Sequence, residues 1–178
     1  MSRLYTTTFE NATGEAAELF SQIKSKMGKV PNAYLTIGSN SPQLLGLALQ
    51  HNLALASSSL KAQELEAINL AVSEATGCDY CLAAHTMLGK MAGFSKEQMQ
   101  KLRKGSYDES EKLNSLVNFV NQVVKTRGTL PVSAIESLRN AGYNDRQVVE
   151  IISAISAIYF TNTINRVNDT VVDFPKAD

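Results

Sequence analysis

The chain has 178 residues, 44% of them hydrophobic, and its 17 lysines and arginines balance its 17 aspartates and glutamates. This length and composition are typical of a globular protein with a sizeable core, so we expect residues 1–178 to form a single domain. The balanced charge argues against nucleic acid as a partner and against attraction to an acidic membrane surface.

Helical periodicity runs through nearly the whole chain, and no segment shows a sustained alternation of apolar and polar residues. The first helix is predicted at 14–27, where Gly28 and Pro31 end it. Ser41-Pro42 supplies a cap and a first-turn proline for a helix that runs to about Ser57. Further helices are predicted at 61–75, 78–92, 96–104, 110–126, 131–140 and 145 to about 167. We therefore predict an all-α fold.

Two of these segments, 65–75 and 148–160, are apolar on more than one helix face. In the first, only Glu66, Asn69 and Ser73 form a polar stripe, which by pattern alone would face water. A helix that is apolar nearly all round is buried within the protein or in a subunit interface. We therefore expect a homo-oligomer that assembles through helical faces.

The expected location is a reducing cytoplasm. Residues 1–14 contain no long apolar stretch, and the longest apolar-rich run, 148–160, is short and includes Glu150 and two serines. We therefore expect neither a signal peptide nor a membrane span. In this compartment a close pair of cysteines is more often catalytic or metal-binding than part of a structural disulfide.

The chain has 2 cysteines, Cys78 and Cys81, and both lie in the segment GCDYCLAAH at 77–85. At about 100° per residue, Cys78, Cys81 and His85 share one helix face, whereas Tyr80 points away from it. The sulfurs are expected in the first helical turn, where unpaired N–H groups and the helix dipole favour thiolate over thiol.

Three interpretations of this motif compete. The two cysteines and the histidine could be buried core residues without a chemical role. They could ligate zinc, with His51, a carboxylate or water as the fourth ligand, because zinc sites usually need four. They could also form a redox dithiol that cycles between two thiols and a disulfide, which is the interpretation that the spacing favours.

The segment from Glu66 to His85, with Leu70-Ala71-Val72 and Gly77 between its ends, resembles the core of the alkylhydroperoxidase D-like proteins. These belong to the carboxymuconolactone decarboxylase superfamily. The motif core spans about 60–93, and the resemblance extends from about residue 28 to about residue 175. Weaker matches follow in the right order: Val30-Pro31-Asn32, Ser41-Pro42, Phe119-Val120, the segment 138–142, Asn144-Asp145, Val149-Glu150 and Asn162-x2-Asn165-Arg166.

The resemblance implies an all-helical fold, assembly into trimers or hexamers, and a thiol peroxidase activity without a cofactor or metal. In such proteins the residue matching Cys81 attacks the peroxide, and the one matching Cys78 resolves the sulfenic acid to a disulfide. Residues matching His85 and Glu66 form a proton relay with the cysteines. A dithiol reductant, in some members a lipoyl group on a partner protein, then restores the thiols.

One residue departs from the pattern of the best-known members, which have a histidine where this chain has Tyr80. Tyrosine is a poor base near pH 7, so the departure favours the peroxidase-related branch. The decarboxylase branch generally lacks the cysteine pair. A non-catalytic redox sensor or a protein disulfide reductase would use the same motif. His51 is expected in the core or an interface, and an apolar substrate cleft is expected near Tyr34, Leu35, Tyr159 and Phe160.

Overall fold

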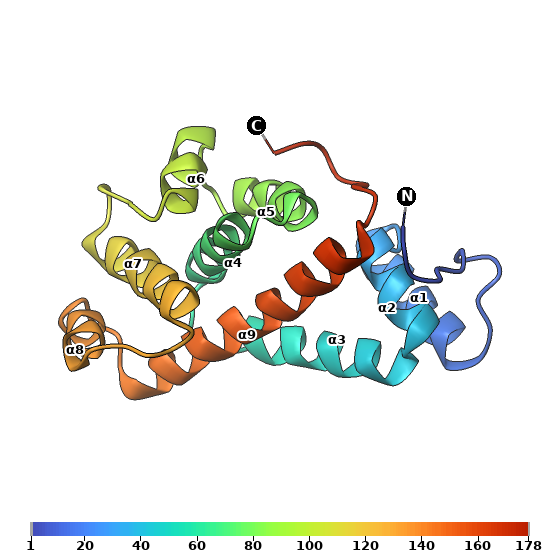
Figure 1. Cartoon of the computed structure of the whole chain (residues 1–178), viewed down its shortest axis with the longest axis horizontal. Helices are drawn as coiled ribbons and strands as arrows, with labels where there is room; N and C mark the ends of the chain where they lie inside the picture. The colour runs from blue at the N-terminus through green and yellow to red at the C-terminus, as the bar shows by residue number, and fades with distance from the viewer. Residues whose placement is uncertain (1, 178) are drawn as a thin grey trace.

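The computed structural model describes residues 2–177, and this part of the chain forms nine α-helices and no strand, so the all-α prediction is confirmed. In chain order (Figure 1) the helices are α1 Gly14–Met27, α2 Asn32–Asn40, α3 Pro42–Ala56, α4 Ala62–Thr76, α5 Asp79–Met91, α6 Lys96–Arg103, α7 Glu111–Thr126, α8 Val132–Asn140 and α9 Asp145–Asn168.

Helix α2 was not predicted from the sequence. It occupies the short segment between Pro31 and Ser41, two residues that mark helix boundaries. Pro31 indicates the end of α1, but it also serves as the N-cap of α2, where a missing N–H group costs nothing. A single proline therefore stands between two helices rather than between a helix and a loop.

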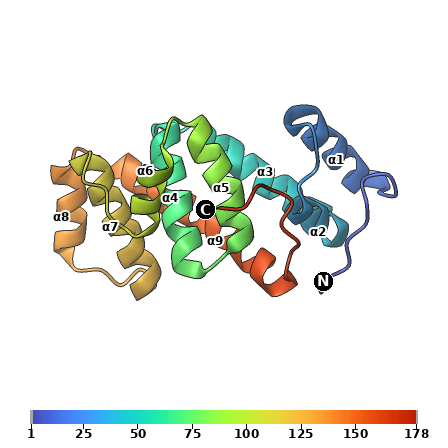
Figure 2. The ribbon, with the colours of Figure 1, turned by 90° about the horizontal axis from the view of Figure 1, so that it is seen from above.

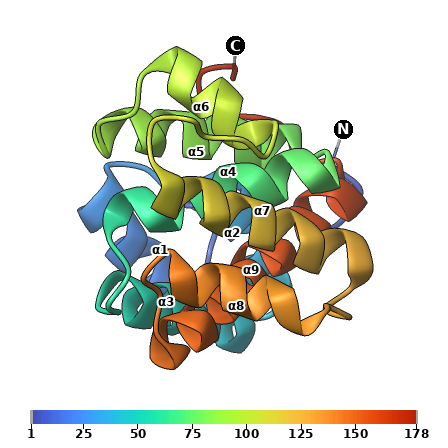
Figure 3. The same cartoon turned by 90° about the vertical axis from the view of Figure 1, so that its left-hand side faces the viewer.

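Helix α4 lies at the centre of the molecule and packs against α5, α6, α7 and α9 (Figures 1 and 3). Its apolar side chains on several faces are fully buried within the chain, as its sequence predicts: Ala67, Ile68, Leu70, Ala71 and Val72. A second, smaller core joins α1, α2 and α3 at the opposite end of the molecule from α7 and α8 (Figure 2).

Helix α9 runs across the molecule and contacts α2, α3, α4 and α5. The apolar run at 148–160 belongs to this longer helix of 24 residues, so the prediction that the run is too short to span a membrane needs correction. By length and composition alone α9 could cross a bilayer, and 39% of its most apolar window is buried inside the chain. Several of its apolar side chains, including Val149, Ile152 and Tyr159, remain exposed.

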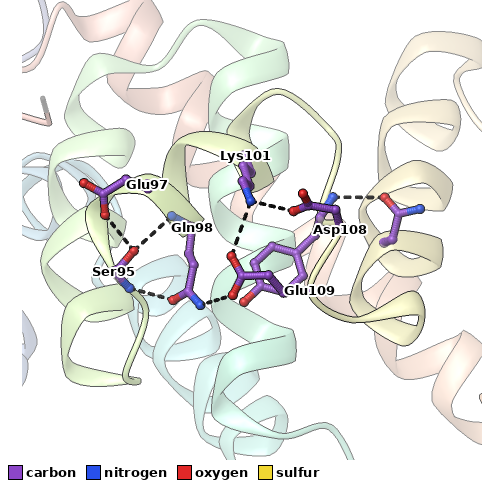
Figure 4. Close-up of polar contacts among 8 residues, drawn as sticks. Ser95, Glu97, Gln98, Lys101, Asp108 and Glu109 are labelled. Carbon is purple, nitrogen blue, oxygen red and sulfur yellow. Dashed lines mark hydrogen bonds and ion pairs between the residues drawn. The ribbon is translucent and has the colours of Figure 1, made fainter.

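The α6 region is held by polar contacts at the surface (Figure 4). Ser95 caps α6 by accepting a hydrogen bond from the backbone N–H of Gln98, and the Gln98 side chain accepts one from the backbone N–H of Ser95. Lys101 pairs with Asp108 at 2.6 Å and with Glu109 at 3.4 Å, which ties α6 to the loop that precedes α7. These exposed pairs order the loop and stabilise it only modestly.

Candidate active site

The two cysteines lie where the chain reverses from α4 into α5. Gly77 ends α4 in the left-handed conformation, with φ of 66°, which glycine adopts without a steric penalty. Cys78 then caps α5, and its sulfur accepts the backbone N–H of Cys81 at 3.3 Å. This turn lays α5 back along α4, so that the cysteine motif faces the helix that carries Glu66.

The Cys78 and Cys81 sulfurs lie 2.7 Å apart and are joined by a hydrogen bond. That bond lowers the pKa of Cys78, with a further lowering from the backbone N–H of Cys81. The same bond, together with burial, raises the pKa of Cys81. When the pair loses its first proton, the negative charge is therefore centred on Cys78, and the remaining hydrogen is shared between the two sulfurs. The sequence predicted a lowered pKa for both cysteines. For Cys81 in the reduced pair this prediction is wrong, because its pKa is raised.

Cys81, but not Cys78, lines a pocket with about 550 Å³ of empty space that is open to solvent. The pocket also receives His85, Thr161 and Asn165, and its remaining wall is apolar, including Met27, Pro31, Tyr34, Met87, Leu88 and Phe174. A molecule with an apolar body can therefore bind against the Cys81 sulfur, whereas Cys78 is buried and does not line the pocket.

Glu66 and His85 meet between α4 and α5. The Glu66 Oε2 atom lies 2.8 Å from Nδ1 of His85, both side chains are mostly buried, and the Asn69 amide donates to the other Glu66 oxygen at 3.3 Å. Within residues 2–177 no hydrogen bond joins His85 to either sulfur, although His85 favours the Cys78 thiolate electrostatically. Glu66 contacts His85 of α5 and Ser73 contacts Asn162 of α9, which overturns for these two side chains the expectation from pattern alone that they face water.

His85 lies between two cavities. The second cavity is lined by Glu66, Asn69 and Asn52, and both cavities share Tyr34, His85, Leu88 and Thr161. The imidazole is thus accessible from the apolar cysteine side and from a more polar side that contains its carboxylate partner. This position suits a group that moves a proton between a reacting molecule and solvent.

Tyr80 does not point away from the site, as the helical arithmetic predicted. Its ring lines the Cys81 pocket, and its hydroxyl donates to Asp173 Oδ1 at 2.7 Å and accepts the Ala33 backbone N–H at 3.1 Å. Burial raises the pKa of Tyr80, so it is not a base near neutrality. Tyr80 also contacts the Phe174 ring, with centroids 5.6 Å apart, and so helps to hold the C-terminal tail over the pocket.

Lys29 reinforces the tail from the α1–α2 turn. Its ammonium group lies 2.9 Å from Asp173 Oδ2 and 4.2 Å from the centroid of the Phe174 ring. The wall that Phe174 provides is therefore fixed by Tyr80 on one side and Lys29 on the other. The expected cleft residues Tyr159 and Phe160 line other surface hollows, whereas Tyr34 does line the pocket.

His51 lies away from the cysteines. Its Nε2 atom is 2.6 Å from the Ser153 hydroxyl of α9, in a groove shared with Leu44 and Leu47. Among residues 2–177, no three His, Cys, Asp or Glu side chains are grouped closely enough to hold a metal ion. The ligand set proposed for zinc, with His51 as its fourth member, is therefore not assembled.

Sequence reasoning missed a contact to the Cys81 sulfur. Asn165 of α9 donates from Nδ2 to this sulfur at 3.4 Å, and this bond opposes the upward pKa shift of Cys81. The only signal in the sequence was the match of Asn162-x2-Asn165-Arg166 to related proteins, which assigned no role to any of these residues.

Residues 42–107 match the carboxymuconolactone decarboxylase family. No sequence among curated proteins matches the chain. A peroxidase-related protein from Ralstonia eutropha JMP134 with an alkylhydroperoxidase AhpD core superposes with a TM-score of 0.85 at 20% identity, over 97% of this chain and 92% of its own. The fold expected from the resemblance is confirmed.

Two further structures are similar. The debrominase Bmp8 bound to 2,3,4-tribromopyrrole superposes with a TM-score of 0.81 at 17% identity, over 97% of this chain and 92% of its own. A protein of unknown function from Agrobacterium tumefaciens, with a suggested role as the antioxidant defence protein AhpD, has a TM-score of 0.70 at 25% identity, over 77% of this chain and 95% of its own.

The shared hydrogen of the cysteine pair predicts a thiol titration that depends on both sulfurs. Thiolate absorbance in the ultraviolet should appear below about pH 8.5, the usual cysteine value, and should reach one thiolate per chain. In Cys81→Ala the pKa of Cys78 should rise, because its largest stabilising contact is lost. An unchanged low-pH thiolate in Cys81→Ala would contradict the assignment, and Cys78→Ala, which should lose that thiolate, is the control.

Proposed function

We propose that the chain is an alkylhydroperoxidase D-like, thiol-dependent peroxidase, because residues 42–107 match the carboxymuconolactone decarboxylase family and the fold is similar to that of a peroxidase-related protein with an alkylhydroperoxidase AhpD core. Its substrates are organic hydroperoxides or hydrogen peroxide. One observation carries the proposal: Cys81 lines an open apolar pocket, 2.7 Å from Cys78, with a glutamate-bound His85 on the same wall.

The first step is attack of the Cys81 sulfur on the terminal oxygen of the hydroperoxide. The hydrogen shared between the sulfurs moves to Cys78 as Cys81 becomes the nucleophile, so Cys78 is the immediate base. The O–O bond breaks, Cys81 becomes a sulfenic acid, and the alkoxide leaves with the bonding electrons. His85, held by Glu66, gives the alkoxide a proton, and the product is the alcohol.

In the second step Cys78 attacks the Cys81 sulfur, and water leaves as the disulfide forms. One hydroperoxide and two thiols thus give one alcohol, one water and one disulfide. An external dithiol, such as a lipoyl group, reduces the disulfide by exchange and returns the protein to its starting state. A cycle that starts from two free thiols suits a reducing cytoplasm, where we place the protein.

The apolar pocket also favours a second candidate, reductive removal of bromine from an apolar aromatic molecule. Attack of the Cys81 thiolate on bromine would break the carbon–bromine bond and form a sulfenyl bromide, and His85 would give the aromatic carbon a proton. The Cys78 thiol would then displace bromide, with loss of its proton to solvent, to give the same disulfide. This candidate rests on the apolar wall and on the similar fold of the debrominase Bmp8. Bromide release from a tribromopyrrole, measured beside peroxide consumption, separates the two reactions.

A redox sensor and a protein disulfide reductase would use the same cysteines. A sensor is oxidised once per chain, whereas an enzyme consumes many equivalents of peroxide when a dithiol is supplied. A disulfide reductase would accept electrons from the dithiol without any peroxide. Steady-state turnover with and without peroxide therefore decides among these functions.

We further propose that the protein is a homo-oligomer, a trimer or a hexamer, that buries one face of α3 and α9. Large apolar side chains on this face are exposed on the single chain, among them Leu47, Leu53, Ile152 and Phe160. Leu47 and Phe160 line one groove with His51, so the two helices offer a continuous apolar surface. A second copy of the chain would cover this surface and give His51 the interface position expected for it.

The two cysteines should differ in what their loss does to turnover. Cys81→Ser should abolish the consumption of cumene hydroperoxide in the presence of reduced lipoamide, because no thiol then lines the pocket. Cys78→Ser should consume one equivalent and stop, with a sulfenic acid that dimedone traps and mass spectrometry detects. Equal multiple turnover by Cys81→Ser and the native protein would end the peroxidase proposal.

Loss of the carboxylate beside His85 should slow turnover. Glu66→Gln should lower kcat for cumene hydroperoxide by about 10²–10⁴-fold, the range for removal of a general acid or base. Glu74→Gln is the matched control on the same helix, because Glu74 pairs with Arg103 near the surface at 2.6 Å. Equal activity of the two variants would show that Glu66 is not part of the proton relay.

The oligomer proposal predicts that the protein sediments as an assembly larger than the 19.3 kDa chain. Leu47→Glu should dissociate it, because a buried carboxylate without a partner is unfavourable in an apolar interface. Val132→Glu, on the exposed surface of α8, should leave the assembly intact. Sedimentation velocity measures this, and a native protein that sediments as a single chain would refute the proposal.

A further inference from the structure

The Asn165 side chain is almost fully buried, with 4% of its surface exposed, and it lies on the wall of the Cys81 pocket. Its Nδ2 group donates to the Cys81 sulfur, but its Oδ1 atom is buried and has no hydrogen-bond partner among the described residues. A buried amide oxygen without a donor costs free energy, and buried polar atoms are nearly always satisfied.

The neighbouring buried asparagine is different. Asn162 is fully buried one turn earlier on α9; its Nδ2 donates to the Thr76 hydroxyl at 2.8 Å and its Oδ1 accepts from Ser73 at 3.4 Å. Both ends of that amide therefore have structural partners. Of these two asparagines, Asn165 is the one that contacts the reactive sulfur, lines the pocket and has an amide oxygen without a partner among the described residues, and this combination indicates a ligand that carries a donor hydrogen.

We propose that Asn165 is a further catalytic residue, whose Nδ2 stabilises the Cys81 thiolate and whose Oδ1 accepts the O–H hydrogen of a bound organic hydroperoxide. This inference rests on the proposed peroxidase function and names its substrate class. One planar amide thereby contacts both reacting atoms, sulfur and the terminal oxygen, and brings them together. The apolar wall of the pocket receives the organic group.

The reaction keeps this contact from substrate to intermediate. The Cys81 thiolate attacks the terminal oxygen, the one that carries the hydrogen, and the O–O bond breaks as the alkoxide leaves. The hydrogen stays on the transferred oxygen, so the new Cys81 sulfenic acid still donates its O–H to Asn165 Oδ1. Cys78 then attacks sulfur, and hydroxide leaves with a proton as water. A peroxide without an O–H, such as dicumyl peroxide, leaves Oδ1 unpaired and binds poorly.

The test compares two reactions of the same sulfur in full-length protein carrying Cys78→Ser, so that only Cys81 reacts. Alkylation by iodoacetamide needs the thiolate but has no O–H for Oδ1 to accept, whereas cumene hydroperoxide uses both ends of the amide. The measured quantity is the second-order rate constant for cumene hydroperoxide divided by the second-order rate constant for iodoacetamide. Asn165→Leu should lower this ratio by about tenfold, as expected for the loss of one hydrogen bond in the transition state.

Two more variants complete the test. Asn165→Asp keeps an acceptor oxygen but loses the donor to sulfur, so both reactions should slow while their ratio stays near that of the parent. Asn162→Leu removes a buried asparagine that does not touch the sulfur, and its ratio should not change. Thermal unfolding followed by circular dichroism identifies any variant that does not fold, and if Asn165→Leu is one, Asn165→Leu and Asn162→Leu are replaced by Asn165→Ala and Asn162→Ala.

The outcomes separate the two proposals. A parent protein that consumes cumene hydroperoxide, with neither rate constant changed in Asn165→Leu, overturns the role of Asn165 and leaves the peroxidase function standing. An equal loss in both reactions shows that Asn165 tunes only the sulfur, which overturns the substrate contact. A parent that alkylates normally but does not consume hydroperoxide overturns the peroxidase function, and the inference about its substrate falls with it.

Discussion

The sharing of one hydrogen between Cys78 and Cys81 is the constraint on which the rest of the site depends. Two sulfurs 2.7 Å apart cannot both carry a charge at moderate cost, so ionisation of one opposes ionisation of the other. The helix start favours the charge on Cys78, yet the pocket is open to Cys81. The proposed chemistry at Cys81 therefore needs the charge to move to that sulfur, and hydrogen bonds from Asn165 and Thr161, which lower the pKa of Cys81, favour this move.

The buried position of Glu66 follows from the way α4 meets α5. A helix with apolar residues on nearly every face can place a carboxylate inside the protein only where another polar group meets it. His85 and Asn69 supply those partners. The packing that buries α4 thus fixes the carboxylate against the imidazole, and the short turn at Gly77 fixes the imidazole relative to the cysteines.

The local parts of the structure could be predicted from the sequence, because helix periodicity and the cysteine motif depend on neighbouring residues. The role of Glu66 could not be predicted from local pattern alone. Glu64 and Glu74 lie on the same helix, and only the family resemblance favoured Glu66; Glu64 instead accepts the backbone N–H of Lys61. Asn165 is 84 residues from Cys81, so no local pattern could join them. Tyr80 and Asp173 are 93 residues apart, so the contact between Tyr80 and the C-terminal tail could not be predicted from a local pattern either.

The substitution of tyrosine for histidine at Tyr80 changes the pocket more than the proton chemistry. A histidine there could take part in proton transfer, whereas Tyr80 is buried, has a raised pKa and donates its hydroxyl hydrogen to Asp173. Through that bond and its ring contact, Tyr80 helps to hold Phe174 in the pocket wall. In the peroxidase proposed above, His85 and Glu66 are the proton-transfer pair and the residue before Cys81 shapes the substrate cavity, whose apolar wall favours an organic hydroperoxide over small polar peroxides.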